Sequence, residues 1–150
     1  MNILPEVTIT TKTILLVDDE LNVSEIVELC LKDLGGWNVI TADSPFTALQ
    51  RAEIDRPDAI VLDLSIRGSF IFLKQLRNHL ATQAIPVVLL SATARWLDPE
   101  FLQEYQIAGV ILKPFNPITF PVEMANIIGW DYLPVSHCGV AQMQAELISV

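Results

Sequence analysis

The sequence predicts an α/β protein with a doubly wound, five-stranded parallel sheet. Short apolar runs alternate along the chain with longer amphipathic stretches, which is the order expected of repeated strand and helix units. The runs are continuously apolar, as are strands that are buried on both faces. In a sheet of this kind, ligands bind at the carboxyl ends of the strands. The residues that follow each apolar run are therefore candidates for a functional site.

The first two strand candidates are 13–17 and 37–42. Between them, apolar residues recur at the spacing of one helix face. These residues are Val23, Ile26, Val27, Cys30, Leu31 and Leu34. Gly35-Gly36 favours the end of this helix. After the second strand, Ser44-Pro45 places a capping side chain before a proline, which is typical of a helix start.

The remaining strand candidates are 59–62, 87–91 and 110–112. An amphipathic stretch follows the first of these, and the other two lead to Asp98-Pro99 and Asn116-Pro117. Each of these pairs joins a capping side chain to a proline suited to the first helical position, so we expect helices to begin there. The chain is thus expected to contain five strand–helix units.

The repeating pattern occupies most of the chain but not its ends. Residues 1–12 are rich in threonine and contain Pro5, which indicates a flexible leader. After Gly129 the pattern stops. We therefore expect a leader at 1–12, one folded domain at 13–129 and a C-terminal tail at 130–150. Such a tail is too short for a winged-helix or other DNA-binding output domain.

The composition is that of a folded, acidic protein. Of 150 residues, 51% are apolar, which is enough to form a core. The net charge is −9, and we expect no nucleic-acid partner, because such binding depends on Lys and Arg. The sequence shows neither a membrane-spanning run nor a signal peptide, which predicts a cytoplasmic protein with no membrane partner. Cys30 and Cys138 lack the spacing of a metal site.

Reactive side chains gather at the predicted carboxyl ends of the strands. Asp18 and Asp19 close the first apolar run, while Asp63, Ser91 and Lys113 close three others. Carboxylates crowded in this way repel one another unless a cation lies among them. Mg²⁺ is such a cation, since it binds one or two carboxylates together with water and phosphate oxygens. The cluster therefore predicts a magnesium-dependent phosphoryl-transfer site.

Four short motifs carry a resemblance to a known family. They are Leu16-Val17-Asp18-Asp19-Glu20, Val61-Leu62-Asp63-Leu64, Leu90-Ser91-Ala92 and Leu112-Lys113-Pro114-Phe115. In this order, from about residue 12 to residue 129, the chain resembles a stand-alone receiver domain of the two-component response regulators, in the CheY-like superfamily. The resemblance implies the flavodoxin-like (βα)5 receiver fold.

The resemblance also implies roles for the reactive side chains. Asp63 would be the nucleophile that forms an acyl phosphate. Lys113 would neutralise charge on the phosphoryl oxygens, and Ser91 would hydrogen-bond one of them. The Lys113-Pro114 peptide would be cis. These residues make up the expected catalytic set.

The expected metal ligands come from the same resemblance. Asp19 would bind Mg²⁺ directly, Asp18 through water, and Asp63 and the main-chain carbonyl of Ser65 would complete the protein ligands. Taken singly, Asp18-Asp19 is equally compatible with helix-capping carboxylates. The combination of motifs favours the metal site.

Three features depart from the pattern of the family. The loop that follows Asp63 is short by about two residues relative to that pattern and contains no proline. Val110 stands where an aromatic residue is usual, and Gln106 where glycine is common. The loop frames the phosphorylation pocket, so metal geometry and phosphate lifetime depend on it and are not fixed by the sequence. Val110 predicts weak propagation of the signal, and Gln106 indicates a different exit from the fourth helix.

We expect a signalling module and not an enzyme. It would accept a phosphoryl group on Asp63 from a sensor histidine kinase or a histidine phosphotransfer protein, and then change its affinity for a downstream protein. Self-association into a homodimer is compatible with this function. A receiver-like scaffold that binds without phosphorylation is the main alternative. A hydrolase is a third hypothesis, but Ser65 stands where such enzymes typically place a second acid.

Overall fold

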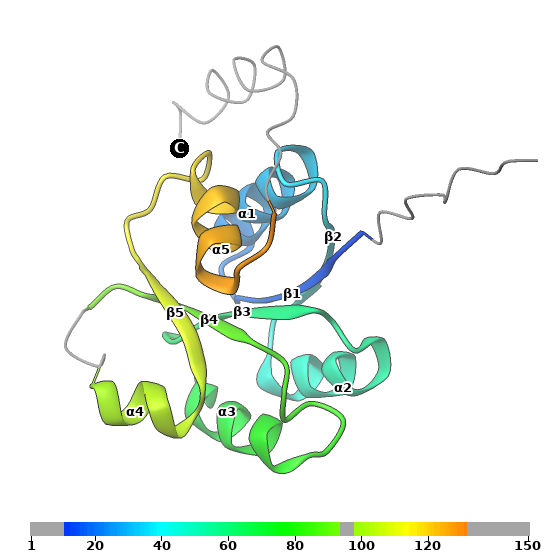
Figure 1. Ribbon diagram of the computed structural model, residues 1–150, viewed down its shortest axis with the longest axis vertical. Helices are drawn as coiled ribbons and strands as arrows, with labels where there is room; N and C mark the ends of the chain where they lie inside the picture. Colours follow the sequence, from blue (N-terminus) through cyan, green and yellow to red (C-terminus); the bar gives the residue numbers. More distant parts are fainter. Residues whose placement is uncertain (1–10, 94–97, 132–150) are drawn as a thin grey trace, which may run out of the picture.

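The computed structural model describes residues 11–93 and 98–131 (Figure 1). The strands are β1 (Thr13–Val17), β2 (Asn38–Ala42), β3 (Ala59–Asp63), β4 (Val87–Ser91) and β5 (Ile107–Leu112). The helices are α1 (Leu21–Asp33), α2 (Pro45–Asp55), α3 (Ser69–Asn78), α4 (Pro99–Glu104) and α5 (Phe120–Ile128). Most of the expected leader and tail, including Cys138, lies outside the described residues.

The five strands form one parallel sheet in the order β2-β1-β3-β4-β5. Helices α1 and α5 cover one face, and α2, α3 and α4 cover the other (Figure 1). The predicted doubly wound flavodoxin-like fold is therefore confirmed. Because the chain moves outward from β1 to β2 and then returns to β3, a crevice is expected where β1 and β3 end side by side.

An apolar layer fills the space on each side of the sheet. Successive strand residues point to opposite faces, so Leu15 packs toward α2 and α3 while Ile14 packs toward α1 and α5. Phe72 of α3 and Phe120 of α5 are the largest fully buried side chains. None of the helices in the described residues is long and apolar enough to cross a membrane.

Two of the three predicted helix starts are confirmed. The Ser44 hydroxyl accepts a hydrogen bond from the Thr47 amide at 3.2 Å and caps α2. The Asp98 carboxylate accepts one from the Glu100 amide at 3.1 Å and caps α4. Each cap satisfies an amide that has no partner within its helix.

The third predicted start, Asn116-Pro117, is wrong, because α5 begins at Phe120. The Asn116 carboxamide does accept a hydrogen bond, from the Ile118 amide at 3.0 Å, but it closes a separate turn at 117–119. Asparagine closes such turns as readily as it caps helices. The turn brings Phe115 against Phe120, with ring centroids 5.0 Å apart.

Strand β5 is longer than predicted, since it begins at Ile107 and not at Val110. Ala108 and Gly109 lower its strand propensity, but pairing with β4 outweighs that preference. Gly109 has a packing role. A Cβ at this position would lie 2.5 Å from the Cγ2 atom of Ile127, so its absence allows α5 to approach the sheet.

Tertiary contacts continue past Gly129 in the described residues. The Trp130 amide donates to the Ala125 carbonyl at 2.9 Å, and its ring packs edge-on against Trp37 at 5.4 Å. The Nζ atom of Lys12 lies 5.6 Å from the Trp130 ring centroid, within the range of a cation–π interaction. Lys12 and Trp130 therefore lie close together near the start of β2.

Arg77 of α3 joins two segments of main chain. Its guanidinium donates to the carbonyls of Tyr105 at 2.8 Å and Gln106 at 3.3 Å, at the α4–β5 junction. It also donates to the carbonyls of Gln83 at 2.9 Å and Ile85 at 2.8 Å, just before β4. One planar, multi-donor side chain thus fixes the start of two adjacent strands.

We expect the Arg77→Met variant to lose about 1–3 kcal/mol of unfolding free energy, because carbonyls at this junction lose their donors. The variant keeps much of the side-chain volume, so the loss reports the hydrogen bonds. Urea denaturation of the parent, Arg77→Met and Arg77→Lys measures it. A compact ammonium cannot reach carbonyls on both sides, so lysine should recover only part of the loss. Equal stability of Arg77→Met and the parent would contradict this role.

Candidate functional site

The candidate site lies at the carboxyl ends of β1, β3, β4 and β5. Asp18 follows β1, Asp63 and Ser91 end β3 and β4, and Lys113 follows β5. Parallel pairing places these ends at one edge of the sheet. The structure therefore brings together residues that are up to about a hundred positions apart in the sequence.

Asp63 and Lys113 form a direct ion pair. The Asp63 side chain is buried, and its Oδ2 atom accepts a hydrogen bond from the Lys113 ammonium. Burial acts to raise the pKa of Asp63, but hydrogen bonds from Lys113 and Ser65 outweigh it and hold this pKa below its ordinary value. Burial acts to lower the pKa of Lys113, but the carboxylates of Asp63, Asp18 and Glu20 together hold it above its ordinary value. Both groups are charged at neutral pH.

Ser65 hydrogen-bonds the other oxygen of the Asp63 carboxylate. Its amide and its hydroxyl donate to Asp63 Oδ1 at 2.9 and 2.7 Å. Sequence reasoning expected only a metal-binding carbonyl from Ser65 and did not foresee these hydrogen bonds. A serine two residues after an aspartate in a turn is the signal that could have predicted them. Both oxygens of Asp63 are thereby held in place.

Asp18 is buried beside this ion pair. Its Oδ1 atom accepts from the Glu20 amide at 2.9 Å, while its buried Oδ2 atom has no partner among the described residues. Burial raises the pKa of Asp18 to about 6; the Glu20 hydrogen bond opposes this rise, and the charge of Asp63 adds to it. An unpartnered carboxylate oxygen beside a second carboxylate fits a hard cation or its bound water.

The metal site predicted at Asp18, Asp19, Asp63 and the Ser65 carbonyl stays a prediction. Asp19 is exposed, and within 11–93 and 98–131 no three His, Cys, Asp or Glu side chains come together closely enough to hold a metal ion. The Asp63 carboxylate is instead held by Lys113 and Ser65. The site thus offers Asp18 and Asp63 as neighbouring carboxylates, with Asp19 exposed next to Asp18.

The main chain of Ser91 is hydrogen-bonded to that of Lys113 at the site. Its carbonyl accepts from the Lys113 amide at 2.8 Å, which places the ends of β4 and β5 side by side. The hydroxyl, however, donates to the Thr93 carbonyl at 2.8 Å and accepts from the Thr93 amide at 3.2 Å. The side chain of Ser91 is therefore engaged in a local turn and is not hydrogen-bonded to Asp63.

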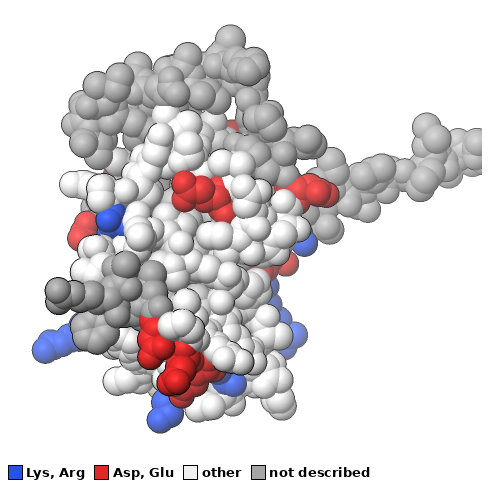
Figure 2. All heavy atoms as spheres, turned by 60° about the vertical axis from the view of Figure 1, so that its left-hand side comes forward, with Lys and Arg blue, Asp and Glu red and all other residues white. Residues whose placement is uncertain are grey.

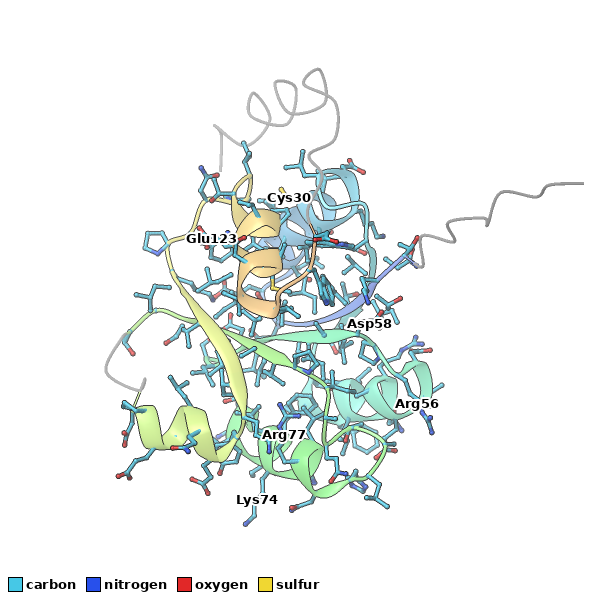
Figure 3. The ribbon with its side chains drawn as sticks, in the orientation of Figure 1. Cys30, Arg56, Asp58, Lys74, Arg77 and Glu123 are labelled. Carbon is cyan, nitrogen blue, oxygen red and sulfur yellow. The ribbon has the colours of Figure 1, made fainter. Side chains whose placement is uncertain are left out.

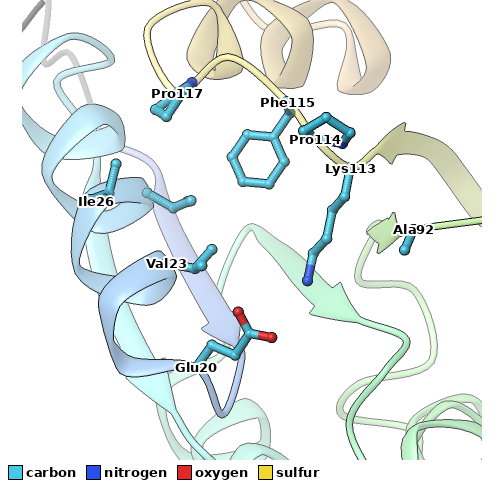
Figure 4. A pocket seen from close by; sticks show the side chains of 9 residues that line it. Glu20, Val23, Ile26, Ala92, Lys113, Pro114, Phe115 and Pro117 are labelled. Carbon is cyan, nitrogen blue, oxygen red and sulfur yellow. The ribbon is translucent and has the colours of Figure 1, made fainter. Parts of the chain in front are cut away.

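A pocket of about 580 Å³ opens beside Lys113 (Figure 4). The Lys113-Pro114 peptide is cis, as predicted, and leads into one wall of the pocket. The lining residues are Glu20, Val23, Ile26, Val27, Ala92, Lys113, Pro114, Phe115 and Pro117. Most of these are apolar and come from α1 and from the segment after β5. Figure 4 shows the Lys113 side chain extending toward Glu20 at one end of this otherwise apolar hollow.

Aromatic packing near the site lies on α3 and α4. The rings of Phe70 and Phe101 are 5.4 Å apart, and those of Phe101 and Tyr105 are 4.9 Å apart. Val110 is partly buried in the same apolar layer, where the family pattern would place a ring. Aromatic contacts in this region therefore come from helices and not from β5.

The fold and the site together define the class of this protein. A five-stranded doubly wound domain with buried carboxylates and a lysine at the strand ends is the architecture of a receiver. The family model of the response regulator receiver domain matches residues 14–123. The chain therefore belongs to the response regulator receiver domain family.

Similar proteins include regulators of different lengths. The chain is 31% identical over 120 residues to response regulator Rre1 of Synechocystis, covering 77% of this chain and 51% of that protein. It is 30% identical over 116 residues to chemotaxis protein CheY-3 of Vibrio cholerae, covering 76% of this chain and 89% of that protein. The chain thus spans about half the length of Rre1 but most of the length of CheY-3.

Two solved structures are also similar. Chemotaxis response regulator CheY4 of Vibrio cholerae has a TM-score of 0.69 and 29% identity, covering 79% of this chain and 99% of that one. The receiver domain of sensor histidine kinase PA1611 from Pseudomonas aeruginosa has a TM-score of 0.67 and 25% identity, covering 79% and 98%. That structure holds a magnesium ion in its active-site cleft.

Proposed function

We propose that this receiver accepts a phosphoryl group on Asp63 from a histidine kinase or a histidine phosphotransfer protein, and then changes its affinity for a protein partner. The observation that carries the proposal is the buried Asp63 carboxylate, held by Lys113 and Ser65 beside Asp18. A carboxylate with a lowered pKa is ionised at neutral pH and available as a nucleophile.

In the proposed reaction, an Asp63 oxygen attacks the phosphorus of a phosphohistidine. The new O–P bond forms as the P–N bond breaks, and the electron pair of that bond leaves with the imidazole. Lys113 stays beside the acceptor and neutralises phosphoryl charge. Asp18, Asp19, Asp63 and the Ser65 carbonyl would hold Mg²⁺, which supplies further neutralisation when bound.

The apolar pocket beside Lys113 supports a phosphodonor that presents its histidine from a helix. Val23, Ile26 and Phe115 form an apolar wall next to the reactive ammonium (Figure 4). A helix can bury one apolar face against such a wall while a histidine at its edge reaches Asp63. The pocket would then position the two reacting groups.

Labelling with acetyl phosphate tests the proposed function. Intact mass should increase by one phosphoryl group in the presence of Mg²⁺, and EDTA should remove most of the increase, because the clustered charges need neutralisation. Labelling that EDTA does not diminish would contradict the magnesium requirement. Absence of labelling would favour the alternative, a scaffold that binds without phosphorylation; the Ser91–Thr93 hydrogen bonds and Val110 are compatible with that function.

Signal propagation should be weak in the parent protein and stronger in Val110→Tyr. Allosteric coupling amounts to about 1–3 kcal/mol, and it requires contacts that differ between the two states. Val110 has no ring to fill space vacated by Ser91, so we expect less than about a fivefold change in hydrogen exchange over residues 99–112 on adding beryllofluoride. The tyrosine variant should show a larger change. A large change in the parent, or an identical change in the variant, would contradict this role of Val110.

A further inference from the structure

The charge of the molecule is unevenly distributed. Residues 44–80, which contain α2 and α3, carry five of the nine Lys and Arg residues but only four of the eighteen Asp and Glu residues. Arg56, Lys74 and Arg77 lie on this part of the molecule (Figure 3). Figure 2 views the side that bears α4 and β5 and shows acidic side chains gathered there. The α2–α3 side is therefore locally basic in a protein that is acidic as a whole.

Three of the cations on this side have no ion-pair partner among the described residues. Arg51 pairs with Asp55 at 3.3 Å within α2. Glu53 faces His79 at 3.8 Å. The remaining cations on the outer surface, Arg56, Arg67 and Lys74, have no acidic partner in the described part of the chain. The acids of α2 thus have neighbours already, whereas these three positive charges are free to attract a partner.

The same side exposes a group of large apolar side chains. Exposed fractions are 74% for Phe46, 76% for Ile54, 64% for Ile71 and 87% for Leu80. Half of the eight large exposed apolar residues in the described part of the chain are these four. Isolated exposed residues need no explanation, but a group of them ringed by charge indicates an interaction surface.

The two helices lie side by side along their lengths. At their N-terminal ends, a Cβ at Gly68 would lie 3.4 Å from the Cγ atom of Pro45. At their C-terminal ends, Glu53 of α2 faces His79. The buried residues of both helices point to the sheet, so the helical repeat places Phe46 and Ile71 on the outer faces of these neighbouring helices.

From these contacts we infer that the outer face of α2 and α3 is a docking surface for an acidic amphipathic helix of another protein. The seam between two parallel helices suits a helix that inserts apolar side chains between Phe46 and Ile71. Acidic residues flanking that apolar stripe would meet Arg56, Arg67 and Lys74. The charge of the surface selects an acidic partner, and its apolar residues supply the contact area.

A second copy of the chain fits this surface less well. A two-fold contact would bring the unpaired cations of one copy against those of the other, which is unfavourable. A nucleic acid or an anionic membrane would have to overcome the net charge of −9. The surface also lies on the opposite face of the sheet from the apolar pocket lined by α1 residues, so it goes beyond the proposed phosphoryl transfer.

A phage-displayed library of helical peptides tests the inference. Each peptide of the library has one apolar stripe, flanked by acidic, neutral or basic residues. Peptides are selected for binding to the full chain in the absence of Mg²⁺ and acetyl phosphate. Acidic peptides should dominate the selected set. A selected peptide should bind about tenfold more weakly to Phe46→Ser/Ile71→Ser, a loss of about 1.4 kcal/mol. Lys74→Glu should weaken binding as well, and added salt should do the same.

Leu112→Ser provides the matched control, because Leu112 is an exposed apolar residue on β5. It should bind the peptide as the parent does. All the changed residues are exposed, and thermal melts verify that the variants fold. Selection of basic or neutral peptides, or unchanged binding by both α2–α3 variants, would overturn the inference. The inference would also be overturned if the parent self-associates, or binds phosphatidylserine vesicles, and the Phe46→Ser/Ile71→Ser variant does not.

Discussion

Replacing Asp63 by asparagine should reduce labelling by acetyl phosphate to the background of the assay. The amide is a poor nucleophile, and no other carboxylate in the described residues is paired with Lys113. Asparagine keeps the shape of the side chain, and its carbonyl oxygen can still accept from Lys113 or Ser65. Loss of labelling would therefore reflect loss of the nucleophile and not loss of the fold.

Asp43→Asn is the control for this experiment. Asp43 follows β2 at the same edge of the sheet but is exposed, so its replacement should leave labelling unchanged. Intact mass after equal incubation gives the extent of labelling, and peptide mapping gives its position. If Asp63→Asn is labelled as fully as the parent, the acceptor is another residue.

The location of the site could be predicted because it follows from the strands. Buried parallel strands are continuously apolar, so the first polar residue after each run marks the edge of the sheet. Asp18, Asp63 and Lys113 were found in this way, and the structure places them together. Long-range neighbours are fixed here by topology, and topology depends mainly on the order of the elements.

Local hydrogen bonds could not be predicted in the same way. The hydrogen bonds between the Ser91 hydroxyl and the Thr93 main chain were not foreseen, and the bond from Ser91 to a phosphoryl oxygen stays a prediction. The hydrogen bonds from the Ser65 amide and hydroxyl to Asp63 were not foreseen either, and the metal-binding carbonyl of Ser65 stays a prediction. Short polar side chains have several nearby partners of similar energy. The sequence therefore indicates which residues reach the site but not which atom each one presents.

The limits of helices and strands depended on packing that local patterns do not contain. The Asn116 side chain can either cap a helix or close a turn. Its hydrogen bond from the Ile118 amide closes a turn before α5. Contact between Phe115 and Phe120 accompanies that arrangement. Strand β5 likewise includes Ala108 and Gly109 because β4 supplies a partner. Tertiary contacts outweighed local propensity in both cases.

Asp18→Asn should stabilise the metal-free protein at neutral pH. Asp18 is buried with an unpartnered carboxylate oxygen, whereas the neighbouring Asp19 is exposed, so relief of carboxylate repulsion is expected at Asp18. The pKa of Asp18 rises from 3.8 to about 6 on folding, chiefly through burial. A rise of this size corresponds to a penalty of up to about 3 kcal/mol for the charged form at pH 7.5.

The pH dependence has a definite sign. Because the pKa of Asp18 is higher in the folded state than in the unfolded state, the folded state holds more protons between about pH 4 and pH 6. The contribution of Asp18 to stability therefore falls as pH rises through this window. Asparagine does not titrate, so the variant should exceed the parent by up to about 3 kcal/mol at pH 7.5 and by little at pH 4.

Urea denaturation of the parent and Asp18→Asn in EDTA, at pH 4 and pH 7.5, measures this difference. The carboxamide oxygen of the variant can still accept from the Glu20 amide, and its NH₂ group can face Asp63 where the parent has an unpartnered oxygen. Adding Mg²⁺ at pH 7.5 should stabilise the parent more than the variant, since a bound cation offsets the same carboxylate charge. A variant that is less stable than the parent in EDTA at pH 7.5 would show that Asp18 is not a source of strain. The clustered-carboxylate description of the site would then be wrong.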